Sequence, residues 1–379
     1  ENRGKTNDMS RMKEQKSKLA RSQDELCATE LSRKCSGGYR TRRLLAGIFL
    51  LLILGSCRQE SAGDTVLTRY GFRGETMGTV YSVLYYAEEE QADLKTSIDS
   101  LLIAINEEVS NWDSTSTVSR FNQSEAGIDA SEKIHFLINY DLARSAWEAT
   151  DGAFEPTIMP LTNYYGFGYG PKELEGGIDT LLVTELMASM GMDAINREGN
   201  YLRKSKPSIQ LDLGGSAKGY GVDAVADFLS ELGLEAHYVE IGGEARGTGR
   251  KPEGPWTVGV NLPEEGAAFT DIVEVIPLEN RSVATSGNYR NYYREGGQTF
   301  SHTINPKTGF PERNRLLSAS VLAPDCGTAD AFATACMVLG PDEAAELIES
   351  REELEGYFLI RGADGELEVW TSVGMKLEE

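Results

Sequence analysis

Short stretches rich in β-branched residues follow one another through the second half of this 379-residue chain. From Tyr238 onward they read "YVEIGG", "WTVGV", "DIVEVIPL", "SVATS" and "LSASVLA", and residues 70–86 form a longer stretch of the same kind. Helical spacing of apolar residues is found at 94–109, 134–149, 184–190, 222–232, 329–339 and 343–350. Strands that come in runs, with helices interspersed, argue against a doubly wound parallel sheet. The pattern therefore predicts an α+β fold with mixed or antiparallel sheets.

Residues 1–43 differ in composition from the rest of the chain. They are polar, rich in Lys, Arg and Ser, and have no apolar period. We expect this region to be a disordered extension or an over-extended gene start, and we exclude it from the fold prediction.

A signal-peptide pattern follows in "RRLLAGIFLLLILGSC". Two arginines precede an apolar run that is short for a membrane-spanning helix, and small residues and Cys57 end it. The "LGSC" ending resembles a bacterial lipoprotein box, in which the cysteine is lipidated. We therefore predict a lipoprotein signal peptide at 44–57, a linker at 58–69 and one domain at 70–379. The alternative is an uncleaved anchor helix, and both alternatives tether the domain to a membrane outside the cytoplasm.

The formal net charge of −22 argues against a nucleic-acid partner, because phosphate backbones are bound by clustered Lys and Arg. Any phosphate that this protein binds must be held by local lysines, by backbone N–H groups or by a metal ion.

The stretch "DLGGSAKGYGVD" at 212–223 joins an apolar segment, 209–213, to the helix expected at 222–232. It is neither a phosphate-loop motif nor a dinucleotide fingerprint. Glycines between a strand and a helix usually satisfy only the backbone geometry of a turn. A phosphate cradle and a tight turn are both consistent with this stretch taken alone.

Two further stretches combine polar residues and glycine, "HTINPKTGFP" at 302–311 and "GTADAFATA" at 327–335. Asp330 and Thr334 lie four residues apart and so share one face of the expected helix. They form either a capping Asp with a threonine bonded back to the helix, or two oxygen ligands for a hard cation such as Mg²⁺. His302 precedes a compact turn, which suits a general base.

The two cysteines of the expected domain, Cys326 and Cys336, could pair in an oxidising compartment. The apolar helical run around Cys336 favours a small buried thiol instead.

Eight stretches in this order resemble the ApbE family, the FAD:protein FMN transferases. They are "ETMGT", "SNWDSTSTVSRFN", "GAFEPTIMPL", "DLGGSAKGYGVD", "EIGGEARGTG", "VATSGNY", "HTINPKTGFP" and "TADAFATA". The resemblance runs from residue 70 to the C-terminus and implies an ApbE-like fold related to the T-fold. It also implies a periplasmic, lipid-anchored enzyme of the bacterial cell envelope that uses Mg²⁺ to split FAD. The resemblance further implies that FMN is moved to a threonine of an acceptor protein, expected to be a subunit of a membrane electron-transport complex, and that AMP is released.

The family's pattern also implies a set of site residues. The expected FAD contacts are Met77, Trp112, Ala153, Phe154, Glu155, Asp212, Lys218 and Ile304. The expected metal ligands are the carbonyl of Gly215 and the side chains of Asp330 and Thr334. His302 is the expected catalytic base. Glu155 stands where an Asp is common, so its contact is the least defined.

Two other functions remain open at this stage. The same residues would let water attack FAD, which would make the protein an FAD pyrophosphatase. A lipid-anchored protein that binds flavin without chemistry is the third alternative, and the pair Asp330 and Thr334 argues against it.

Overall fold

The computed structural model describes residues 66–170, 177–264, 266, 268, 270–288, 292–295 and 298–377, with only the backbone at 292–295 and 298–300. The extension at 1–43, the signal peptide at 44–57 with Cys57, and the linker as far as residue 65 lie outside the described residues. The expected linker ends slightly earlier than 69, because strand β1 begins at Thr68.

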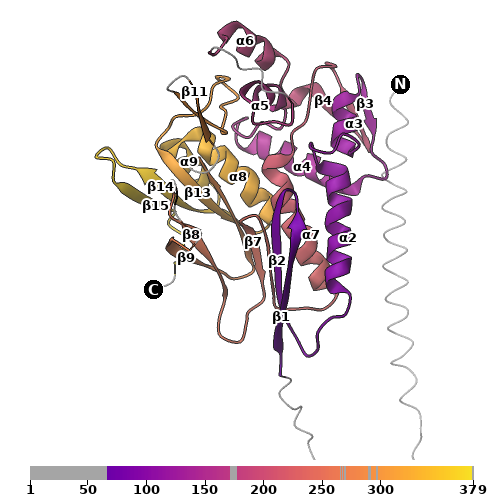
Figure 1. Cartoon of the computed structure of the whole chain (residues 1–379), viewed down its shortest axis with the longest axis vertical. Helices are drawn as coiled ribbons and strands as arrows, with labels where there is room; N and C mark the ends of the chain where they lie inside the picture. The colour runs from indigo at the N-terminus through magenta and orange to yellow at the C-terminus, as the bar shows by residue number, and fades with distance from the viewer. Residues whose placement is uncertain are drawn as a thin grey trace, which may run out of the picture. The chain divides into compact units, whose positions relative to one another are not determined.

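An eight-stranded sheet forms the centre of the described domain (Figure 1). Its strands, in spatial order, are β1 (Thr68–Thr76), β2 (Thr79–Ala87), β6 (His237–Ile241), β7 (Glu244–Thr248), β10 (Arg281–Gly287), β13 (Leu316–Ala323), β14 (Glu355–Arg361) and β15 (Leu367–Thr371). Every neighbouring pair in this sheet is antiparallel. The α+β prediction with antiparallel sheets is confirmed.

Helices are interspersed among the strands. They are α2 (Leu94–Val109), α3 (Thr117–Gln123), α4 (Ile134–Ala149), α5 (Met159–Tyr165), α6 (Thr180–Ala188), α7 (Gly214–Glu231), α8 (Cys326–Leu339) and α9 (Pro341–Glu349). The bounds predicted for α2 and α4 are confirmed at both ends, and those for α8 and α9 within three residues. Helix α6 begins four residues earlier than predicted and ends two residues earlier.

Smaller elements complete the domain. They are β3 (Gly127–Asp129), β4 (Ile195–Glu198), β5 (Tyr201–Lys204), β8 (Trp256–Asn261), β9 (Ile272–Leu278), β11 (Tyr292–Glu295), β12 (Gln298–Ser301) and the short 3₁₀ helix Met192–Ala194. Strands β8 and β9 pair as one hairpin, and β11 and β12 as another.

The two faces of the central sheet bury different partners. On β13, Ala319, Val321 and Ala323 point to one face and pack with helices α8 and α9, whereas Leu322 points to the other and packs with the β8–β9 hairpin. This alternation follows from the two-residue period of a strand. Helix α7 packs against α8 and against strands β6 and β7. It therefore covers the same face of the sheet as α8, and the two helices lie side by side over the middle of the sheet.

Three local predictions were wrong. Residues 70–86 are the hairpin β1–β2 rather than one strand, because the chain reverses at Met77 and Gly78, both with positive φ. Residues 209–213 form no strand. Helix α7 begins at Gly214 rather than at residue 222, so the glycines of "DLGGSAKGYGVD" lie within its first two turns. They fit a helix there because neighbouring elements pack closely against them.

Both cysteines of the described region are free and buried. The buried-thiol alternative is therefore the one that this structure supports. Within the described residues, no helix combines the length and the apolar character that a membrane span requires.

We expect the free energy of unfolding to fall as the pH drops below about 6.5, the ordinary histidine pKa. His237 on β6 is fully buried, and this burial lowers its pKa. The unfolded chain therefore binds a proton at a higher pH than the folded protein does, and acid favours unfolding, by up to about 1.4 kcal/mol per pH unit. Urea unfolding of His237→Gln between pH 7.5 and 5 should show a smaller pH dependence than that of the wild type. Equal slopes for wild type and His237→Gln would contradict the prediction.

Candidate active site

Two neighbouring cavities open at the N-terminal part of α7. One is also lined by α2 and α5, and the other by α8 and β10. The Trp112 cavity has a volume of about 460 Å³ and the Asp330 cavity about 480 Å³. The residues that line both are Thr162, Asp212, Gly214 and Lys218. All twelve residues predicted from the sequence line one cavity or both. Their predicted contacts with FAD or metal remain predictions, but the fold does bring them together.

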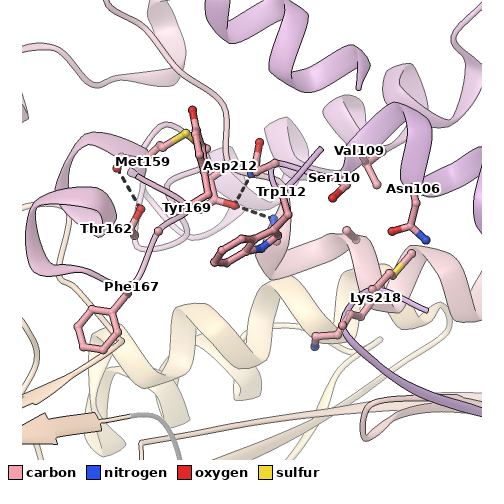
Figure 2. A pocket seen from close by; sticks show the side chains of 16 residues that line it. Asn106, Val109, Ser110, Trp112, Met159, Thr162, Phe167, Tyr169, Asp212 and Lys218 are labelled. Atoms are coloured by element: carbon pink, nitrogen blue, oxygen red, sulfur yellow. Dashed lines mark hydrogen bonds between the residues drawn. The ribbon is translucent and has the colours of Figure 1, made fainter. Parts of the chain in front are cut away.

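The Trp112 cavity offers aromatic surface, as Figure 2 shows. The Trp112 side chain is 77% exposed, so a flat ring system can stack on its indole. Met77 lines the same cavity from the β1–β2 turn, where its φ of 50° is unusual for a residue other than glycine. Gly221 gives Met77 its space, since an added Cβ there would lie 3.0 Å from the Met77 methyl carbon.

The N-terminus of α7 lies where the two cavities meet. Gly214 lines both cavities and Gly215 lines the Asp330 cavity. The dipole of this 18-residue helix favours an anion at its N-terminal end, where the Gly214 N–H is bonded to the Asp212 carboxylate. An added Cβ on Gly215 would lie 2.8 Å from the Phe154 ring and 3.4 Å from Thr334 Oγ1. The glycine thus allows the loop at 153–155 and helix α8 to approach the helix end.

Asp212 precedes this helix end. Its carboxylate accepts hydrogen bonds from Asn111 Nδ2 and from the Gly214 backbone N–H, both at 2.9 Å. Burial raises the pKa of Asp212, although these two hydrogen bonds act in the opposite direction. These hydrogen bonds, drawn in Figure 2, fix the side chain. Asp212 lines both cavities.

Lys218 lies between two buried carboxylates. Its Nζ is 2.5 Å from Glu244 Oε1 and 3.8 Å from Asp330 Oδ1. Burial lowers the pKa of Lys218, but Asp330 and Glu244 outweigh this effect and the pKa is raised overall. Burial raises the pKa of both acids. The two acids therefore hold the Lys218 ammonium in place. Because two carboxyl groups face one ammonium, acidic groups outnumber basic groups in this cluster.

Asp330 does not cap helix α8. Asp325 is the N-cap, and its side chain accepts the Thr328 backbone N–H. Asp330 is buried one turn further along, and its Oδ2 accepts the Gly219 backbone N–H at 3.1 Å. The capping alternative for Asp330 is thus wrong.

The oxygen groups around Asp330 fit a hard cation. Asp330 and Thr334 both line the cavity, Gly215 adjoins Thr334, and Ser286 Oγ lies 3.5 Å from Thr334 Oγ1. Carboxylate, hydroxyl and carbonyl oxygens are the donors that Mg²⁺ prefers. Within the described part of the chain, no group of three or more His, Cys, Asp or Glu side chains forms a metal cluster. Such a site would therefore rely on one carboxylate and on oxygens from its ligand.

The loops of the Asp330 cavity carry the remaining predicted residues. Glu155 accepts hydrogen bonds from Thr157 at Oε1 and from Trp147 Nε1 at Oε2, so its carboxylate holds its own loop in place. His302 packs edge-on against Phe167 at a ring-centroid distance of 6.4 Å. Ile304, two residues further along the chain, is buried. His302 therefore lies at the cavity wall, as a base for an incoming group must.

Sequence reasoning missed several residues that line the cavities. Four of them with polar side chains are Asn111, Tyr169, Glu244 and Ser286. Three of the four lie within stretches quoted for the resemblance, so the signal for them was present in the motif order but not in any single residue pattern.

Comparison with known proteins decides the family. The sequence profile described as the ApbE family matches residues 77–358, which is most of the chain and contains all twelve predicted residues. The chain belongs to the ApbE family. It is 34% identical over 328 residues to an FAD:protein FMN transferase of Vibrio cholerae, covering 86% of this chain and 95% of that protein. It is 33% identical over 313 residues to the Escherichia coli protein of the same description, covering 80% and 87%.

Solved structures of ApbE proteins agree with this assignment. The flavin transferase ApbE from Vibrio cholerae superposes with a TM-score of 0.72 at 33% identity, covering 81% of this chain and 98% of that one. The ApbE protein of Thermotoga maritima superposes with a TM-score of 0.66 at 28% identity, covering 79% and 96%. The ApbE-like fold predicted from the motif order is confirmed.

Proposed function

We propose that this protein is an FAD:protein FMN transferase that attaches FMN to a threonine of an acceptor protein and releases AMP. The observation that carries the proposal is the junction of the two cavities. There a helix N-terminus and Lys218 meet the oxygen groups of Asp330 and Thr334, next to an exposed indole. A pyrophosphate linked to a flat ring system is the kind of ligand that such a junction suits.

The chain's own groups account for most of the reaction. The acceptor hydroxyl oxygen bonds to the phosphorus on the FMN side, the P–O bond to AMP breaks, and AMP leaves with the bridging oxygen. His302 takes the hydroxyl proton, since it lines the cavity wall. The N-terminus of α7 and Lys218 hold the pyrophosphate oxygens.

Mg²⁺ would be held by the Asp330 carboxylate, the Thr334 hydroxyl and the Gly215 carbonyl. When bound, it would neutralise charge that spreads over the pyrophosphate oxygens. The excess of acid over base in the Asp330 cavity supports a requirement for an added cation, because FAD brings further negative charge.

Products distinguish this proposal from its two rivals. Incubated with FAD and Mg²⁺, a transferase releases AMP in proportion to acceptor and yields little free FMN. A pyrophosphatase releases FMN and AMP without an acceptor, and a binding protein releases neither. Chromatographic assay of both nucleotides, with and without a threonine-bearing acceptor, separates the three, and release that does not depend on acceptor would refute the transferase proposal.

We expect His302→Ala to slow FMN transfer by about 10²- to 10⁴-fold, the usual contribution of a general base. FAD affinity and melting temperature should change little, because the ring lies at the cavity wall. Single-turnover transfer, FAD titration and thermal melting measure the three quantities. If His302 only holds its turn in place, FAD affinity and melting temperature fall instead, and the single-turnover rate at saturating FAD is unchanged.

The proposal extends to the cell envelope. The "LGSC" ending supports lipidation of Cys57 and a membrane-anchored enzyme at the periplasmic face. The acceptor would then be a subunit of a membrane electron-transport complex. In a bacterial host we expect mass spectrometry of the mature N-terminus to find a diacylglyceryl group on Cys57, and cleavage at any other residue would contradict this.

A further inference from the structure

Glu244 is a buried acid in the Asp330 cavity that neither the predicted FAD contacts nor the predicted metal ligands include. It is 3% exposed, and it begins strand β7 directly after a turn at Gly242 and Gly243. Both glycines have positive φ, which a two-residue hairpin turn of this kind requires. The turn therefore delivers the carboxylate to the cavity wall, where Gly242 and Glu244 lie together.

The two oxygens of Glu244 have different surroundings. Oε1 lies 2.5 Å from Lys218 Nζ, while Oε2 is buried and makes no hydrogen bond to any described group. Burying a carboxylate with one oxygen unsatisfied is costly, and a buried ion pair seldom contributes enough stability to offset that cost. The arrangement is thus better explained by a role in the site than by stability.

Lys218 has a second possible partner. Asp330 Oδ1 lies 3.8 Å from the same Nζ, further away than Glu244 Oε1. An ammonium paired with Asp330 alone would occupy the place that a cation needs beside that carboxylate. In the structure, Glu244 is the acid that holds the lysine in a close ion pair.

We propose that Glu244 is a positioning residue that draws Lys218 away from Asp330, so that Asp330 stays available to a divalent cation and the ammonium faces the FAD pyrophosphate. This inference rests on the proposed function for the identity of the ligands. It assigns Glu244 no contact with the reacting atoms.

Substitutions of Glu244 and of Lys218 should change cation binding in opposite directions. With Glu244→Gln, Lys218 pairs with Asp330, so Mn²⁺ binding weakens. With Lys218→Met, no ammonium competes for Asp330, so Mn²⁺ binds at least as tightly as in the wild type. Adding Lys218→Met to Glu244→Gln should therefore restore Mn²⁺ affinity. A charged hydrogen bond contributes enough that the loss in Glu244→Gln should be about 10-fold or more.

The effects of the two single substitutions on the FAD dissociation constant should not add up in the double variant. Glu244→Gln and Lys218→Met should each raise the FAD dissociation constant about 10-fold or more, because each removes a fixed ammonium from the pyrophosphate. The double variant should match Lys218→Met, since Glu244 acts only through the lysine. Glu240→Gln is the matched control, because Glu240 lies on the preceding strand and does not line either cavity.

The experiment measures Mn²⁺ binding by electron paramagnetic resonance and FAD binding by fluorescence, on the full chain and these four variants. Restored Mn²⁺ affinity in the double variant, together with an FAD dissociation constant equal to that of Lys218→Met, supports the inference. The inference is overturned if the losses of FAD affinity in the two single variants add up in the double variant. It is also overturned if Glu244→Gln binds both ligands like the wild type. If Glu244→Gln does not fold, Lys218→Met decides alone, because weakened Mn²⁺ binding in that variant contradicts competition. A wild type that binds both ligands but transfers no FMN refutes the proposed function and not this inference.

Discussion

Asp330→Asn should abolish FMN transfer without destabilising the metal-free protein. Asp330 is buried and supplies the one carboxylate among the predicted cation ligands, so losing its charge should cost about 10³-fold or more in rate. Asparagine keeps the shape and can still accept the Gly219 N–H. The substitution also removes one of the two acids that lie beside Lys218. The repulsion between the buried carboxylates of Asp330 and Glu244 is then lost.

Thermal melting with and without Mg²⁺ checks this prediction independently of turnover. A ligand that binds only the folded state raises its melting temperature. The wild type should therefore gain stability from Mg²⁺ and Asp330→Asn should not. Asp325→Asn is the matched control on the same helix, because Asp325 caps α8 and does not line the Asp330 cavity. Transfer by Asp330→Asn at the wild-type rate in excess Mg²⁺ would remove the metal assignment.

Gly219→Ala should be the most destabilising small substitution in helix α7. An added Cβ would lie 2.2 Å from the Cys326 carbonyl oxygen, a backbone atom at the start of α8 that cannot move aside by itself. Forcing α7 and α8 apart should lower the free energy of unfolding by about 3 kcal/mol, at the upper end of the range for overpacking. The higher helix propensity of alanine offsets about 1 kcal/mol of that cost.

Gly221→Ala is the matched comparison for this substitution. Alanine gains the same propensity at Gly221, but its Cβ would meet the flexible methyl end of Met77 at 3.0 Å. Urea unfolding should therefore show a much smaller loss of stability for Gly221→Ala. Equal losses for the two variants would show that close packing of α7 on α8 does not explain why glycine stands at 219.

The same glycines mark the limit of what the sequence predicts locally. Glycine has low helix propensity, so "DLGGSAKGYG" indicated a loop, yet packing against α8 and Phe154 places it in a helix. The β1–β2 turn was missed because Met77 carries no turn signal, although it adopts a left-handed φ. Helices α2 and α4 were predicted correctly because their apolar spacing is continuous.

For the site as well, some features were predictable from the sequence and others were not. The order of eight motifs predicted which segments meet, and the fold brings all twelve predicted residues to two adjoining cavities. The pairing of Glu244 with Lys218 was not predictable, because it depends on how helix α7 packs against the β6–β7 hairpin. Nor does a sequence motif reveal that the Glu155 carboxylate is engaged by its own loop.

Mass spectrometry of the acceptor protein determines whether the enzyme transfers FMN to a threonine. The purified protein is incubated with FAD, Mg²⁺ and a threonine-bearing acceptor, and the acceptor is then digested and sequenced. We expect FMN joined to the threonine through a phosphoester, one AMP released per FMN attached, and neither product with Asp330→Asn. An unmodified acceptor beside free FMN and AMP would contradict it and identify the protein as a pyrophosphatase.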